Sequence, residues 1–212
     1  MKIKNILLVE GKDDEHVIYA IRDFYGVEKE TFKIKDKQGI ENVLEETDST
    51  LVDGNLDVCL GIVIDADTDL SIQWQRVSNI LRKAGYKNIP NQPNPNGTIL
   101  EQENKIKFGV WIMPDNEIRG MLEDFLAFLI PDKDTNQVWE KAVKCSEEVL
   151  KDISEDNRFS EIHLSKAQIH AYLAWQKECG KPFGLSITTK YLQADNPNCE
   201  SFVNWLKLLF VE

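Results

Sequence analysis

Short apolar runs alternate with segments of helical periodicity along the first 130 residues. The runs are rich in Ile, Leu and Val, which is typical of buried strands, and the longer segments place apolar residues on one helix face. We expect strands at 3–9, 31–35, 56–64, 98–100 and 105–113. We expect helices at 13–24, 40–51, 71–84 and 117–129. This alternation predicts an α/β fold with a mainly parallel sheet flanked by helices.

The pattern becomes mostly helical after Pro131. Apolar residues recur at helical spacing between 138 and 153, and Ser165 is a suitable cap for a helix that would run to about Cys179. A last apolar cluster at 202–210 indicates a short terminal helix. We therefore expect a core at 1–130 and a helical C-terminal extension at 131–212, packed together as one globular unit.

The composition narrows the class of protein. Apolar residues make up 42% of the 212 residues, enough for a sizeable core, and no apolar run approaches the roughly 18–20 residues that span a bilayer. The N-terminal apolar stretch is too short for a secretory signal. The 4 cysteines lie far apart, which favours free thiols in a reducing compartment over zinc ligands or disulfides. We expect a cytoplasmic protein with no membrane association.

Acidic residues outnumber basic ones, 36 against 25, so the formal net charge is −11. A large nucleic-acid-binding face needs a patch of Lys and Arg, and the acidic balance argues against one. A small site in which a divalent cation supplies the positive charge is still compatible with this balance.

Acidic side chains directly follow two of the expected strands. Glu10 comes after the first strand, and Asp65, Asp67 and Asp69 come after the third. In an open parallel sheet, ligands bind beyond the carboxyl ends of the strands, so both groups should meet at one edge. Carboxylates about 4 Å apart repel by roughly 4 kcal/mol at an effective dielectric of 20. Protonation would offset that repulsion, and so would a Mg²⁺ or Mn²⁺ ion; the alternative is that these acids are helix caps and solvated loop residues.

Two other acidic motifs do not fit. An EF-hand loop starting at Asp65 would need Gly at its sixth position and Glu at its twelfth, where this chain has Leu70 and Arg76. The haloacid-dehalogenase phosphatase motif would need Thr or Val in place of Asp69.

The two acidic groups resemble the motifs of the Toprim domain. The first is Val-Glu-Gly-Lys-Asp-Asp at 9–14, and the second is the Asp-x-Asp of Asp65 and Asp67. Leu-Glu-Asp-Phe at 122–125 is similar to a further acidic motif of the overcoming-lysogenization-defect (OLD) nucleases and small stand-alone Toprim proteins. The resemblance covers about residues 3–130 and implies a Rossmann-like Toprim core.

The resemblance implies a role for each matching residue. Glu10 would act as general acid/base or as a metal ligand, and Asp65 and Asp67 would hold Mg²⁺. Gly11 would let the backbone turn tightly after the strand. Lys166 would contact a phosphate or the charge that develops during the reaction, although as an isolated feature it is equally an ordinary surface lysine. The residues that would complete one or two metal sites are Asp14, Asp69 and Glu123.

The implied activity is Mg²⁺-dependent cleavage of DNA or RNA. The chain has no GxxxxGK[ST] phosphate loop, so any ATPase function would come from a separate partner protein. A second hypothesis is a non-catalytic Toprim-like module that binds a metal, a nucleotide or a partner, and the net charge favours it. A receiver-like phosphoacceptor is a third, disfavoured because Gly11 stands where receivers carry a second acid.

Overall fold

The computed structural model describes residues 5–54 and 56–211 and contains a mostly parallel sheet. Within these residues the sheet has 5 strands in the order β2-β1-β3-β5-β4. The parallel strands are β1 (Ile6–Val9), β2 (Lys33–Asp36), β3 (Cys59–Asp65) and β5 (Lys107–Met113). The short strand β4 (Thr98–Leu100) runs antiparallel to β5 at one edge.

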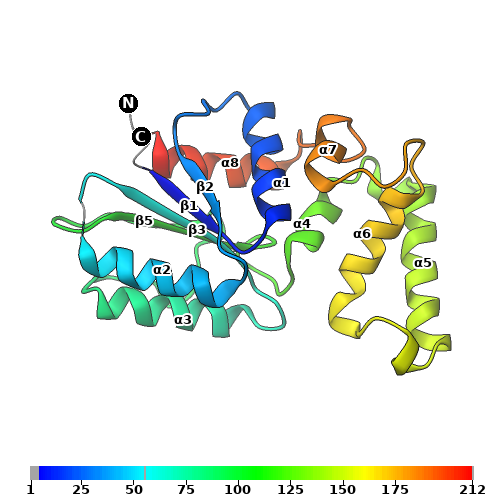
Figure 1. Cartoon of the computed structure of the whole chain (residues 1–212), viewed down its shortest axis with the longest axis horizontal. Helices are drawn as coiled ribbons and strands as arrows, with labels where there is room; N and C mark the ends of the chain where they lie inside the picture. The colour runs from blue at the N-terminus through cyan, green and yellow to red at the C-terminus, as the bar shows by residue number, and fades with distance from the viewer. Residues whose placement is uncertain (1–4, 55, 212) are drawn as a thin grey trace.

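Helices cover both faces of the sheet (Figure 1). Helices α1 (Lys12–Phe24) and α8 (Pro197–Phe210) lie on one face, and α2 (Ile40–Asp53) and α3 (Leu70–Lys83) lie on the other. The strand residues alternate accordingly, because successive side chains point to opposite faces. Leu7 and Val63 join the core under α1 and α8, while Leu8 and Ile62 join the core under α2 and α3. The expected α/β class is confirmed.

Helix α8 lies close to the sheet because two glycines face it. Gly61 and Gly109 are paired neighbours on β3 and β5. A Cβ atom at Gly109 would lie 2.5 Å from Leu209 Cδ2, and one at Gly61 would lie 2.9 Å from the same atom. Any larger residue at either position would therefore push the terminal helix away from the strands.

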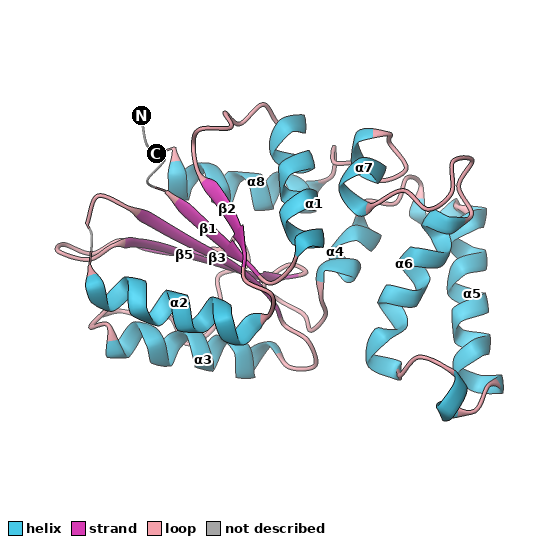
Figure 2. Ribbon diagram, in the orientation of Figure 1, coloured by secondary structure: helices cyan, strands magenta, loops and turns pink. Residues whose placement is uncertain are grey.

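The remaining helices lie beyond one end of the sheet (Figure 2). They are α4 (Leu122–Phe128), α5 (Gln137–Asp152), α6 (Leu164–Ala174) and α7 (Phe183–Thr188), with single 3₁₀ turns at Lys133–Thr135, Glu155–Asn157 and Glu161–His163. Trp139 of α5 and Tyr172 of α6 belong to the same apolar core as the sheet residues under α1 and α8. The division at residue 130 stays a prediction, and the core is continuous across it.

Two helix boundaries differ from the expected ones. The helix expected at 117–129 begins only at Leu122, because Asp115 Oδ1 accepts hydrogen bonds from the N–H groups of residues 117 and 118 and forms a turn there. Asn116 and Gly120 also have φ values of 65° and 143°, which no α-helix contains. Helix α6 ends at Ala174 rather than near Cys179, and α7 was not expected from the sequence. Residues 3 and 4 of the first expected strand lie outside the described residues.

Among the described residues, no helix combines the length and the apolar character needed to cross a bilayer.

We expect Gly109→Ala to lower the free energy of unfolding by roughly 1–3 kcal/mol, since its methyl group would overlap Leu209. Chemical denaturation of the single variants and of the Gly109→Ala/Leu209→Ala double variant would measure the coupling. The double variant should lose less stability than the two single variants together. Strict additivity would contradict the close approach of α8.

Candidate functional site

The carboxyl ends of β1 and β3 bring Glu10 and Asp65 together. Val9 and Val63 are register partners in this parallel pair, so Glu10 follows the end of β1 beside Ile64 and Asp65, the last residues of β3. Glu10 Oε1 accepts a hydrogen bond of 2.8 Å from the backbone N–H of Asp65. The first acidic side chain is thereby fixed against the end of the third strand, as the sequence motifs predict.

Two helix starts add further carboxylates to this edge. Asp14 lies in the first turn of α1, where its Oδ2 accepts a hydrogen bond of 3.0 Å from Gly11 N–H. Glu123 lies in the first turn of α4 and is 5% exposed. Asp65 connects β3 to this helix, because its Oδ1 accepts a hydrogen bond of 3.0 Å from Leu122 N–H. We call Glu10, Asp14, Asp65, Asp67 and Glu123 the acidic cluster.

Burial and mutual repulsion make these acids hard to ionise. Burial raises the pKa of Glu10 to about 7, although the hydrogen bond from Asp65 N–H acts in the opposite direction. Burial and then the charge of Glu10 raise the pKa of Asp14 to about 7. The pKa of Asp65 is raised well above its usual range by burial and by the charges of Asp14, Glu10 and Glu123. These side chains therefore interact electrostatically across the strand ends and the two helix starts.

Asp67 reaches the cluster from the turn between β3 and α3. Its φ of 52° places it in the left-handed region, and its backbone forms an isolated antiparallel bridge with Gly120. Asp67 N–H donates to Gly120 O at 2.8 Å, and Gly120 N–H donates to Asp67 O at 2.9 Å. Gln73 Nε2 donates to Asp67 Oδ2 at 3.3 Å. The Asp67 charge also raises the pKa of Glu10, which places its carboxylate near the strand ends.

Asp69 has a different local role. Its Oδ1 caps α3 by accepting hydrogen bonds from Ser71 N–H at 2.8 Å and Ile72 N–H at 3.3 Å. It is not among the charges that act most strongly on Glu10, Asp14 or Asp65. The structure thus gives Asp69 the role of a helix cap, and its part in metal binding stays a prediction.

Lys166 lies beside the cluster on α6. Its Nζ is 3.3 Å from Glu123 Oε1, and its side chain is 51% exposed. Helix α6 is thereby linked to the start of α4, across about 40 residues of chain that contain α5. Its contact with Glu123 was not predicted from the sequence, and its expected contact with a phosphate stays a prediction.

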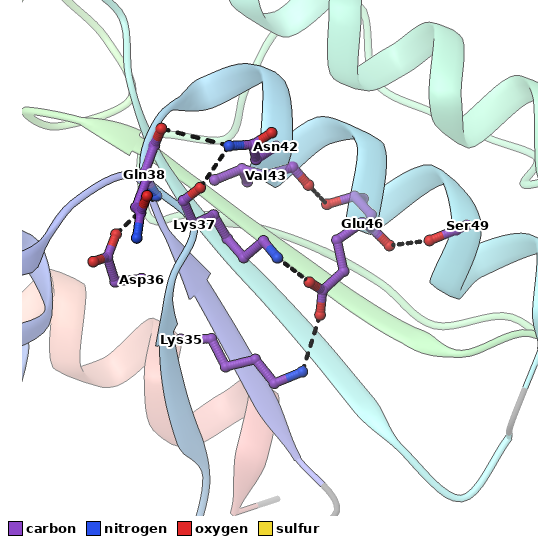
Figure 3. Close-up of polar contacts among 9 residues, drawn as sticks. Lys35, Asp36, Lys37, Gln38, Asn42, Val43, Glu46 and Ser49 are labelled. Atoms are coloured by element: carbon purple, nitrogen blue, oxygen red, sulfur yellow. Dashed lines mark hydrogen bonds and ion pairs between the residues drawn. The ribbon is translucent and has the colours of Figure 1, made fainter.

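The loop after β2 supports Glu10 from its other side. Gly39 N–H donates to Glu10 O at 2.8 Å. Figure 3 shows that Lys35 and Lys37 both point toward Glu46 on α2; Lys35 Nζ is 3.0 Å from that carboxylate. Asn42 closes the loop by donating to Lys37 O at 2.8 Å. These lysines therefore stabilise the loop instead of adding free positive charge to the cluster.

Arg76 and Gln73 of α3 were missed by the sequence analysis. The charge of Arg76 lowers the pKa of Glu10. Arg76 also donates a hydrogen bond of 3.3 Å to Gln73 Oε1. Both side chains therefore lie on the helix face toward the strand ends. Their spacing of i and i+3, directly after an acidic turn, is the signal that would have found them.

A cleft of about 660 Å³ opens beside Asp67. Its walls come from the β3–α3 turn, from residues 119–121 before α4, and from the start of α6. Polar side chains on these walls include Thr68, Arg119, Ser165 and Gln168. The acidic cluster thus adjoins a space large enough for a small ligand.

The donor set of the cluster suits a hard divalent cation. Carboxylate oxygens are the ligands that Mg²⁺ and Mn²⁺ prefer, and a cation there would offset the burial and the repulsion that raise the pKa values of Glu10, Asp14 and Asp65. Among residues 5–54 and 56–211, no three Asp, Glu, His or Cys side chains already converge in the arrangement of a bound metal. Metal binding would therefore require some of these side chains to move closer together.

Comparisons with solved structures found similar chains. Two solved structures of the C-terminal region of the Xanthomonas campestris pv. campestris OLD protein are similar to it. The one phased with platinum has a TM-score of 0.49 and 12% identity and covers 98% of this chain and 94% of that chain. The one phased with mercury has a TM-score of 0.40 and 11% identity, with coverages of 95% and 97%. No curated protein matches the sequence.

A protein-family model described as "Protein of unknown function (DUF3226)" matches residues 4–211. Because the match spans nearly the whole chain, the protein belongs to the DUF3226 family.

Proposed function

We propose that the protein cleaves phosphodiester bonds in nucleic acid with the help of Mg²⁺ or Mn²⁺, as a Toprim-type nuclease. The observation that carries this proposal is the acidic cluster, in which Glu10, Asp14 and Asp65 lie at one edge of the sheet with raised pKa values. Free carboxylates arranged in this way reduce stability, so their presence favours a function that uses them. The Glu-Gly-x-x-Asp and Asp-x-Asp motifs support the same interpretation.

Each residue of the cluster has a proposed part. Asp14, Asp65, Asp67 and Glu123 would hold the cation, which when bound would polarise a phosphate oxygen. Glu10, with a pKa of about 7, would give or take a proton near neutral pH. Lys166 would turn from Glu123 toward the phosphate and balance its negative charge.

A binding module without catalysis is the second candidate. The net charge of −11 favours it, because a nuclease that grips a long duplex needs many basic contacts. A separate ATPase or other partner protein would supply such contacts in either case. The two candidates differ in whether the protein cleaves phosphodiester bonds. Only the nuclease would cleave them, and its cleavage would depend on Glu10.

Nicking of supercoiled plasmid, alongside cleavage of single-stranded RNA, tests the proposal in Mg²⁺ and in Mn²⁺. We expect Glu10→Gln to reduce metal-dependent cleavage by about 10²–10⁴-fold, the usual contribution of a general acid or base. The glutamine keeps an oxygen that can accept the hydrogen bond from Asp65 N–H, so folding should be preserved. Equal cleavage by wild type and variant would indicate a contaminant, and no cleavage by either would favour the binding module.

Asp14→Asn and Asp13→Asn form a matched pair for the metal ligands. Both remove one negative charge from the first turn of α1, but Asp14 is buried in the cluster and Asp13 is exposed. We expect Asp14→Asn to raise the Mg²⁺ concentration for half-maximal cleavage by at least about tenfold, a loss of about 1.4 kcal/mol of binding free energy. Asp13→Asn should leave it unchanged. An equal effect of both would show that only overall charge matters.

The raised pKa of Asp14 also predicts how stability depends on pH. The folded protein holds this proton up to about pH 7, whereas the unfolded chain loses it near pH 4, so the free energy of unfolding should fall as the pH rises between these values. Asp14→Asn should therefore be more stable than wild type at pH 8 in EDTA, and the difference should vanish near pH 4. Thermal unfolding at both pH values would measure it. A wild type that is more stable than the variant at pH 8 without metal would contradict the repulsion.

A further inference from the structure

The cleft beside Asp67 has walls that are fixed by the backbone. The bridge between Asp67 and Gly120 joins the β3–α3 turn to the segment before α4 by two hydrogen bonds. Asp124 Oδ2 accepts a hydrogen bond of 2.8 Å from Met121 N–H and holds the end of that segment. A Cβ atom at Gly120 would lie 2.7 Å from the same Oδ2, so the wall leaves no room for a side chain there. The cleft is therefore a preformed feature of the fold.

Arg119 gives this cleft a cation that is free to bind a ligand. It lines the cleft, is exposed, and has no hydrogen bond or ion pair with any described residue. Lys166, by contrast, is already engaged by Glu123 at 3.3 Å. An unpaired guanidinium beside a carboxylate cluster is suited to bind a phosphate group, with two parallel hydrogen bonds.

Apolar and neutral polar groups line the cleft together with Arg119 and with the acidic residues Asp67, Asp124 and Glu161. Ile162 lines the cleft and is 56% exposed, and Ile118 beside Arg119 is 50% exposed. Ser165 and Gln168 on α6 contribute side chains that donate and accept hydrogen bonds. Such a mixture suits the face and edge of an unpaired base, which a duplex would keep stacked inside its helix.

The size and charge of the cleft favour one strand over two. Its volume of about 660 Å³ lies in the range of small-ligand pockets. A duplex carries a phosphate charge every 1.7 Å or so along its axis, about twice the density of a single strand. The repulsion between the phosphates and a protein of net charge −11 is therefore stronger for a duplex than for a single strand. Arg119 can offset only a small part of this repulsion.

We infer that this cleft holds one or two nucleotides of a single strand, or of an unpaired end, with Arg119 binding a phosphate next to the scissile bond. The inference rests on the proposed function, since it places the substrate of that same site. It adds a substrate class, unpaired nucleic acid, and a positioning residue outside the acidic cluster.

Fluorescence anisotropy with a labelled oligothymidylate, free or paired with its complement, tests this inference. Ca²⁺ replaces Mg²⁺ so that cation binding is retained while hydrolysis is held back. We expect the single strand to bind at least about tenfold more tightly than the duplex, a difference of about 1.4 kcal/mol. Arg119→Ala should weaken single-strand binding by a similar factor. The matched control is Arg82→Ala, which removes the same charge from the last turn of α3.

The outcomes separate this inference from the proposed function. Equal affinity for strand and duplex, equal effects of Arg119→Ala and Arg82→Ala, or no binding of either oligonucleotide would overturn the inference. Glu10-dependent nicking of plasmid could still occur in those cases, and the proposed function would then stand alone. Arg119-dependent binding of the single strand without any cleavage would support the cleft and refute the nuclease.

Discussion

The burial of like charges at the ends of β1 and β3 is the constraint on which the site depends. Glu10, Asp14 and Asp65 are all harder to ionise than in water, and burial is the first cause in each case. The fold offsets this cost with backbone hydrogen bonds: Asp65 N–H binds Glu10, Gly11 N–H binds Asp14 and Leu122 N–H binds Asp65. Every one of these donors lies at a strand end or a helix start, where backbone N–H groups are otherwise unpaired.

The same carboxylates also contact the helices at 122–174. Asp65 binds the first N–H of α4, and Glu123 on the next residue pairs with Lys166 of α6. The carboxylates therefore connect the sheet to the helical part of the chain as well as to each other. The cleft beside Asp67 lies where these parts meet, which explains why it adjoins the cluster instead of lying elsewhere on the surface.

The sequence predicted the sheet and the clustered acids because both depend on local patterns. Apolar runs mark the strands, and an acid at the end of a parallel strand must lie at one edge. Asp69 could not be told from Asp67 in this way, since the left-handed φ of Asp67 turns the chain before Asp69 caps α3. The chain does turn between β1 and α1 as expected, but the φ of −146° at Gly11 is a conformation that any residue adopts, so the turn does not depend on glycine. Arg119 depends on tertiary placement and carries no sequence motif, whereas Arg76 is marked only by its i, i+3 spacing from Gln73.

The acidic net charge is compatible with a nucleic-acid substrate because an unpaired basic residue lies at the cleft, whereas several others are paired with acidic side chains. Lys35 and Lys37 are bound to Glu46. Arg76 is bound to Glu41 at 2.6 Å. Arg119 has no such partner among the described residues, and it lies at the cleft. In the proposed site, the net charge of −11 selects against long phosphate backbones in general, whereas a short unpaired segment would bind at the cleft, where Arg119 and the acidic cluster, once it holds a cation, would face the same ligand.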